Sequence, residues 1–124
     1  MDPVLDNQIL DFIRSSVKSV WALELLLLMR RVTAHAWTLD QLVKELRSSR
    51  TIVTDSLSAF VQAGVIREEE QGFRYGPAST ELDQMIERLA KEYTERPTTV
   101  INAIIEAQNA KLQDFANAFR IKRD

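Results

Sequence analysis

The sequence predicts a mostly α-helical fold with one small two-stranded β-hairpin. Apolar residues recur at helical spacing over most of the chain. Two short strand-like runs lie between residues 65 and 75, and Gly64 and Gly76-Pro77 bound them. No internal repeat, low-complexity tract or long linker interrupts this pattern. With 124 residues, 45% of them hydrophobic, the chain is expected to form one domain, residues 1–124.

The N-terminal part, residues 1–37, predicts two helices. Residues 5–16 carry apolar side chains at helical spacing, with Asp6 near the start. Residues 19–31 are apolar nearly all round, which is typical of a central helix packed on several sides. Residues 32–37 have mixed character, and we expect this link to pack loosely.

The middle part, residues 38–76, predicts a helix, a short turn, a second helix and the hairpin. Thr38 is a good N-cap for the first helix, and Ser49 can cap the second after the turn Ser48-Ser49-Arg50. Gly64 is suited to end the second helix in a left-handed conformation. Both helices place apolar residues on one face: Leu39, Leu42, Val43 and Leu46 in the first, and Val53, Leu57, Phe60 and Val61 in the second.

The C-terminal part, residues 77–124, predicts three further helices. Ser79 or Thr80 caps a long helix that Pro97 ends, because the residue before a proline is biased out of helical geometry. Two more helices are expected, from about Thr98 to Ala107 and from about Lys111. Their apolar residues exceed what the core needs, so some are expected to form a twofold interface: Val100, Ile101, Ile104, Ile105, Leu112, Phe115 and Phe119.

Residues 38–76 resemble the winged helix-turn-helix of bacterial transcriptional regulators, in the broad MarR-like and ArsR-like sense. The resemblance rests on the order of the elements and on Leu57, Gly64, Val65 and Ile66, where a glycine before an apolar pair starts the wing. It implies that the first helix is a scaffold and that the second enters the DNA major groove. In a symmetric dimer the two recognition helices would lie about 34 Å apart, one turn of DNA.

This resemblance nominates the helix at residues 50–63 as the DNA-contacting element. Short polar side chains on its outer face allow close approach to base edges, and cations near its N-terminus favour phosphates. Arg67 and Arg74 of the hairpin either reach the DNA backbone or pair with neighbouring carboxylates. The predicted contact residues are Lys44, Arg47, Ser49, Arg50, Thr51, Thr54, Asp55, Ser58, Arg67 and Arg74.

The charge distribution favours a second reading. The net charge is −2, and the hairpin tip is Glu68-Glu69-Glu70-Gln71, which a phosphate backbone would repel. The carboxylate of Asp55 also disfavours DNA binding unless it accepts a hydrogen bond from a cytosine amine. The alternative is therefore a winged-helix protein–protein module that does not bind DNA. Its partner surface would be the acidic residues 68–95 or the apolar C-terminal helices.

Other classes of function find little support in the sequence. The chain has no cysteine and a single histidine, His35, so no metal site is expected. With only three glycines there is no phosphate-binding loop, and no nucleophile–base pair is recognisable, so we expect neither an enzyme nor a cofactor. No signal peptide and no apolar run of membrane-spanning length is visible. We therefore expect a cytoplasmic protein without a membrane partner.

Overall fold

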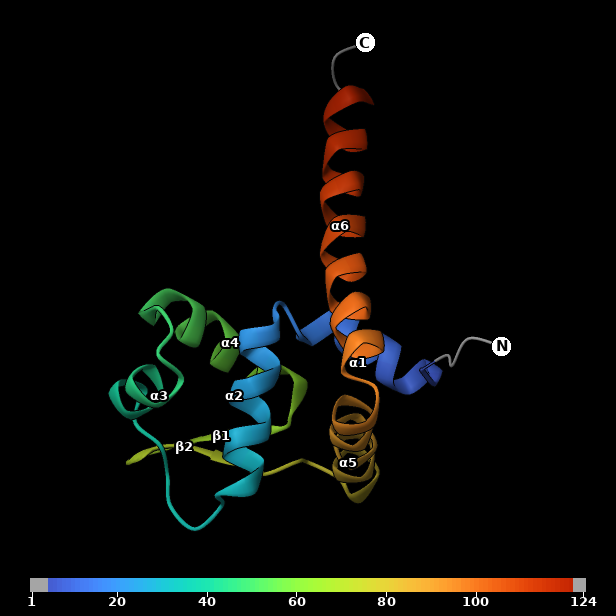
Figure 1. Ribbon diagram of the computed structural model, residues 1–124. Coiled ribbons are helices and arrows are strands. Elements are labelled where there is room, and N and C mark those ends of the chain that lie inside the picture. Colours follow the sequence, from blue (N-terminus) through green and yellow to red (C-terminus); the bar gives the residue numbers. More distant parts are fainter. Residues whose placement is uncertain (1–4, 122–124) are drawn as a thin grey trace.

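The computed structural model describes the backbone of residues 5–121 (Figure 1). Its elements are α1 (Asn7–Ser16), α2 (Val20–Arg31), α3 (Leu39–Leu46), α4 (Arg50–Ala63), β1 (Ile66–Glu69), β2 (Gly72–Tyr75), α5 (Thr80–Glu95) and α6 (Pro97–Ile121). The two strands form one antiparallel sheet. The predicted fold class, mostly helical with one small hairpin, is confirmed.

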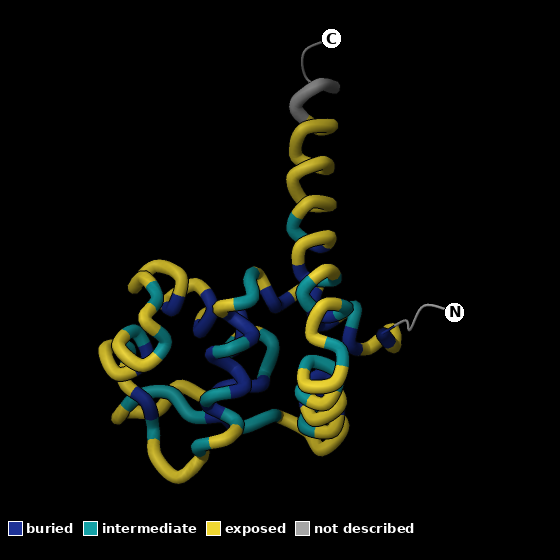
Figure 2. Tube along the Cα trace, in the orientation of Figure 1, coloured by how far each residue is buried: buried dark blue, intermediate teal, exposed yellow. Residues whose placement is uncertain are grey.

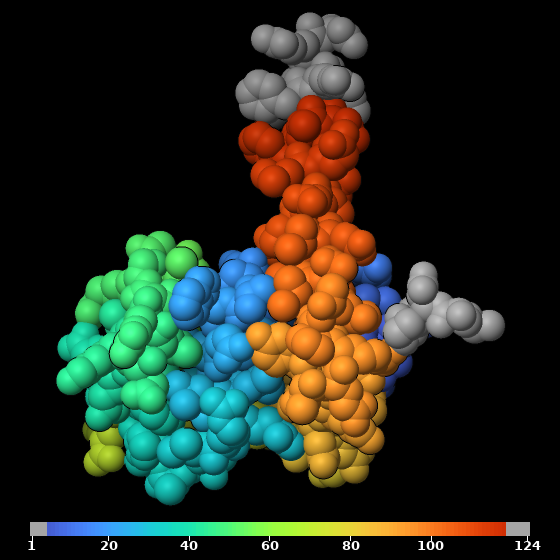
Figure 3. All heavy atoms as spheres, viewed as in Figure 1, coloured from blue at the N-terminus to red at the C-terminus, as the bar shows by residue number. Residues whose placement is uncertain are grey.

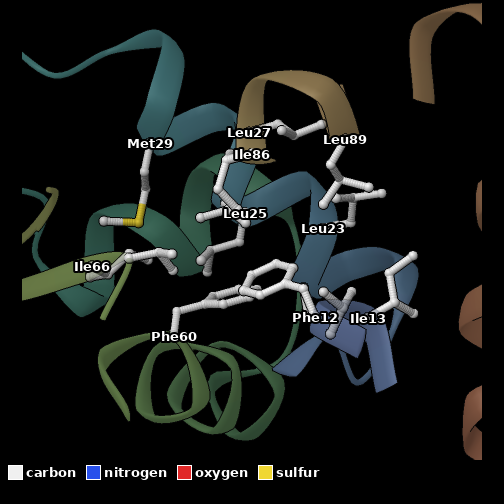
Figure 4. Close-up of a cluster of buried hydrophobic side chains, with 14 of the residues drawn as sticks. Phe12, Ile13, Leu23, Leu25, Leu27, Met29, Phe60, Ile66, Ile86 and Leu89 are labelled. Carbon is white, nitrogen blue, oxygen red and sulfur yellow. The ribbon is translucent and has the colours of Figure 1, made fainter. Parts of the chain in front are cut away.

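The apolar helix α2 lies at the centre of the core. In Figure 1 it runs between α3, α4 and the hairpin on one side and α1 and α5 on the other. Its residues Leu23, Leu26 and Met29 are completely buried. Phe12 of α1 and Phe60 of α4 stack beneath it with ring centroids 6.1 Å apart (Figure 4). A helix that is apolar on nearly all sides is therefore covered on several sides, as predicted.

The helix starts follow from local capping. Thr38 accepts a hydrogen bond from the Gln41 N–H, and the Gln41 side chain accepts one from the Thr38 N–H, which completes a capping box. Ser49 accepts from the Ile52 N–H and Ser79 from the Leu82 N–H. At the other end of α4, Gly64 has φ +79° and ends the helix in the left-handed conformation. These predicted caps are confirmed.

The link before α3 is exposed at residues 33–35, but the prediction of loose packing is wrong for Trp37. Trp37 is 9% exposed, and its backbone exchanges two hydrogen bonds of 2.7 Å with Phe73 of β2. An alanine Cβ at Gly72, where φ is +139°, would stand 2.3 Å from the Trp37 carbonyl oxygen. Trp37 thus extends the hairpin by one bridge to Phe73 and ties it to the start of α3, and only glycine fits at the neighbouring position 72.

The C-terminal region also differs from the prediction. Instead of two helices separated near residues 108–110, α6 is one continuous helix. The sequence from 98 to 121 contains neither Gly nor Pro, so nothing stops helix propagation there. Val100, Ile104 and Ala107 are buried against the body, whereas residues 109–118 are all exposed (Figure 2). Phe119 was also expected in the interface, but its side chain lies outside the described part of the chain.

Candidate nucleic-acid interface

The turn between α3 and α4 presents basic side chains beside the N-terminus of α4. Lys44 is exposed in the last turn of α3, and Arg47 is exposed at its end. Arg47 has φ +52°, a left-handed conformation that costs an ordinary residue about 1–2 kcal/mol and that glycine adopts more readily. Among the described residues other than glycine, Arg47 alone has a positive φ. A cation therefore occupies a position where the backbone conformation favours glycine.

The outer face of α4 is polar and open to solvent. Thr51, Thr54, Asp55 and Ser58 are exposed, as the helical spacing predicts. The opposite face is buried through Val53, Leu57 and Phe60. One apolar side chain, Ile52, is 37% exposed beside the polar face. The structure thus brings the predicted α4 residues together on one accessible surface, immediately after Ser49.

Arg50, the first residue of α4, is already paired with a carboxylate. Its guanidinium nitrogen NH1 lies 2.5 Å from Oδ1 of Asp40, in the first turn of α3. The two side chains are 65% and 80% exposed, so water and salt screen the pair and its free energy is small. Arg50 can therefore exchange this carboxylate for a phosphate at little cost.

The hairpin arginines sit directly opposite each other but differ in their surroundings. Arg67 and Arg74 are register partners in the antiparallel pair. Arg74 donates through Nε to Oε1 of Glu69 at 2.8 Å and through NH1 to the Thr33 carbonyl at 2.7 Å. Arg67 is exposed, and its guanidinium lies over Gly76. Arg74 thus fastens the hairpin to the loop after α2, and Arg67 is the more accessible cation.

A small pocket separates α4 from the hairpin. Its volume is about 240 Å³, and its apolar part comes from Leu39, Leu57, Val61 and Phe73. Thr54, Ser58 and Gln62 of α4 and Glu68 of β1 also line it. The polar face of α4 therefore divides into two parts: an N-terminal part near the cations, and a C-terminal part that borders an apolar pocket with a carboxylate.

The groups with shifted pKa values join α5 to other parts of the molecule: Tyr93 to α2, Tyr75 of β2 to Asp83, and Asp6 to Arg88. The hydrogen bond of 2.6 Å from the Tyr93 hydroxyl to Glu24 raises the pKa of Tyr93 to about 12, with a smaller contribution from burial. Burial, together with the hydrogen bond to Asp83, raises the pKa of Tyr75 far above its usual value. Burial acts upward on the pKa of Asp6, but the Ile9 N–H and Arg88 outweigh it and lower that pKa.

Other sites find no support in the described residues. Within residues 5–118, no three His, Cys, Asp or Glu side chains gather closely enough to hold a metal ion. His35 is exposed, and its ring contacts that of Trp37 at a centroid distance of 4.6 Å. Among the helices described, none combines the length and apolar character needed to cross a lipid bilayer.

Comparison with known proteins gives no relative for this chain. Neither the protein-family models, nor the curated proteins, nor the solved structures contain a significant match.

Sequence reasoning missed several residues that shape the surface. The sequence did not predict the ion pair between Arg50 and Asp40, nor the hydrogen bond that Arg74 donates to the Thr33 carbonyl. Trp37 had a local signal: it precedes the N-cap Thr38, where an apolar residue often packs against the fourth helical position, here Leu42. The pocket had no such signal, because its lining comes from α3, α4 and both strands, which only the fold brings together.

Proposed function

We propose that this chain is a DNA-binding transcriptional regulator of the winged helix-turn-helix type, with α4 as the recognition helix. The observation that carries the proposal is the cationic turn at the N-terminus of α4, where Arg47 and Arg50 flank the cap Ser49. The partial positive charge of a helix N-terminus adds to these cations. Beyond the turn, Thr51 and Thr54 present short polar side chains for base edges, with Asp55 and Ser58 beside them.

In this mechanism the residues have separate roles. Lys44, Arg47 and Arg50 bind phosphates and fix the position of α4 in the major groove. Arg67 of β1 is exposed and contributes a further phosphate contact, whereas Arg74 holds the hairpin in place. Base selection falls to the outer face of α4. A homodimer would present two such helices to successive turns of DNA.

The experiment uses Arg47→Gly, because the two roles of this position predict opposite effects. Removing the side chain relieves a left-handed conformation worth about 1–2 kcal/mol, offset by about 0.5–1 kcal/mol for the greater freedom of glycine in the unfolded chain. Stability is therefore expected to be unchanged or slightly higher. DNA binding is expected to weaken, and the slope of log K against log salt to fall by about 0.9 for one lost phosphate contact.

Binding is measured with labelled genomic fragments at a series of salt concentrations, and stability by urea unfolding. Lys91→Ala on α5 is the matched control, because it removes one exposed positive charge from another element. Arg47→Gly with an unchanged salt slope, or an equal loss in Lys91→Ala, would contradict the role of the turn. Absence of any binding to genomic fragments at low salt would contradict the function itself.

A protein-binding module is the second candidate, and the hairpin favours it. Glu68 lines the apolar pocket between α4 and the hairpin, and Glu69 and Glu70 are exposed next to it. An apolar side chain flanked by Lys or Arg on a partner would match both the pocket and the carboxylates. This candidate predicts that Glu68→Lys abolishes retention of a co-purifying protein while leaving the fold intact, and that low-salt DNA binding is absent.

A further inference from the structure

The C-terminal half of α6 extends away from the rest of the molecule. Figure 3 shows it rising beyond the surface formed by the other helices. Leu112 is 67% exposed and Phe115 is 68% exposed. Ile105, nearer the body, is 49% exposed. Large apolar side chains exposed in a row on one helix mark an interaction surface more often than an isolated one does.

These side chains follow the spacing of a coiled coil. The positions Ile101, Ile105, Gln108, Leu112 and Phe115 are separated alternately by four and three residues, a repeat of 3.5. We call this row the α6 seam. It is distinct from the row Val100, Ile104 and Ala107, which packs against the body. The helix thus carries one apolar row for its own core and a second row beside it.

We propose that the α6 seam pairs with the same seam of a second copy of this chain, in a parallel two-stranded coiled coil. The positions that flank a seam decide which partner is tolerated. Here they are Asn102, Asn109 and Ala116 on one side and Ile104, Lys111 and Ala118 on the other. Lys111 is the single charged residue among them, and in a parallel pair it lies across from Ala116 of the other copy. Two identical helices therefore meet without like-charge repulsion.

Lys111 bears on the orientation, whereas Gln108 does not. The Gln108 side-chain nitrogen Nε2 is buried within its own chain, and no described residue accepts a hydrogen bond from it, so this amide does not reach a second copy. In a parallel pair Lys111 meets Ala116. In the antiparallel register that sets Gln108 against Leu112, the two Lys111 side chains would lie on the same edge, only about 3 Å apart along the axis at 1.5 Å per residue, and would repel each other.

This inference deepens the homodimer of the proposed function, but it depends on α6 alone. Sedimentation of the full chain, from low to high micromolar concentration, is expected to show a monomer–dimer equilibrium. Leu112→Glu is expected to raise the dissociation constant about a hundredfold or more, because both copies lose an apolar contact and gain a charge. Ala110→Glu is the matched control: it adds the same charge at an exposed position on the other side of α6.

Orientation is tested with a spin label. The chain has no cysteine, so Asn117→Cys carries one label per copy. A parallel pair brings the labels to the same level, whereas an antiparallel pair separates them along the axis by about 21 Å if Gln108 faces Leu112 and by about 32 Å if it faces Ile105, at 1.5 Å per residue. A wild-type monomer at high concentration, a dimer that survives Leu112→Glu, a dimer equally lost in Ala110→Glu, or the antiparallel distance would each overturn the proposal. Sedimentation involves no DNA, so failure of the DNA-binding role would not affect this result.

Discussion

Gly72→Ala tests the bridge that joins the hairpin to the start of α3. The new Cβ would stand 2.3 Å from the Trp37 carbonyl oxygen and 3.2 Å from the Thr38 nitrogen, both backbone atoms. Alanine also adopts φ +139° only with strain of about 1–3 kcal/mol. If Trp37 moves away, two backbone hydrogen bonds worth about 0.5–1.5 kcal/mol each are lost. The expected loss of unfolding free energy is therefore about 2–6 kcal/mol.

Gly76→Ala is the matched control, because it lies just after the same hairpin. The Cβ at this position meets only the Arg67 side chain, with Nε at 2.5 Å, and the flexible end of that side chain can move aside. We expect a change below about 1 kcal/mol, typical of a surface substitution. Both variants are measured by urea unfolding followed by circular dichroism. A loss below about 1 kcal/mol for Gly72→Ala, or equal losses for the two variants, would refute the close approach of Trp37.

Two further predictions concern charge and pH. Asp40→Asn releases Arg50 from its exposed ion pair, so DNA affinity at low salt is expected to rise by up to about fivefold, the equivalent of about 1 kcal/mol. The affinity is measured by titration of labelled genomic fragments. An unchanged affinity would speak against a phosphate contact by Arg50. Tyr93 has a folded pKa of about 12 against the ordinary tyrosine value of 10.0, so its stabilising contribution is complete below pH 10 and is lost as pH rises to 12. Urea unfolding across this range is expected to show a shallower decline in Tyr93→Phe than in the wild type, and parallel declines would contradict the Glu24 hydrogen bond.

The starts of α3, α4 and α5 and the end of α4 were predictable because short-range chemistry determines them. Thr38, Ser49 and Ser79 each satisfy a backbone N–H three residues further on, and Gly64 takes a conformation that other residues resist. The exposed face of α4 followed from the same local periodicity. For these features no distant residue has to be known.

The features that escaped prediction depend on distant partners or on weak local signals. Trp37 pairs with Phe73, which no periodicity within residues 32–37 reveals. The expected break between Ala107 and Lys111 is absent, because Gln108, Asn109 and Ala110 lower helix propensity only slightly and do not end a helix. Asp40 reaches Arg50 because the turn brings the first residues of α3 and α4 together, and the sequence alone does not fix that approach.

The charges around α4 also bear on how DNA would approach it. The cations Lys44, Arg47 and Arg50 lie before or at its first residue, while Glu68 lines the pocket beside Thr54, Ser58 and Gln62 further along. A phosphate backbone is therefore attracted at the N-terminal end of α4 and repelled at the part of α4 that lies near the hairpin. An approach that inserts the N-terminal half of α4 and keeps the hairpin tip away satisfies both conditions. In the proposed complex the acidic hairpin would then set the tilt of α4 on the DNA, and a negatively charged chain would be compatible with the proposed DNA-binding role.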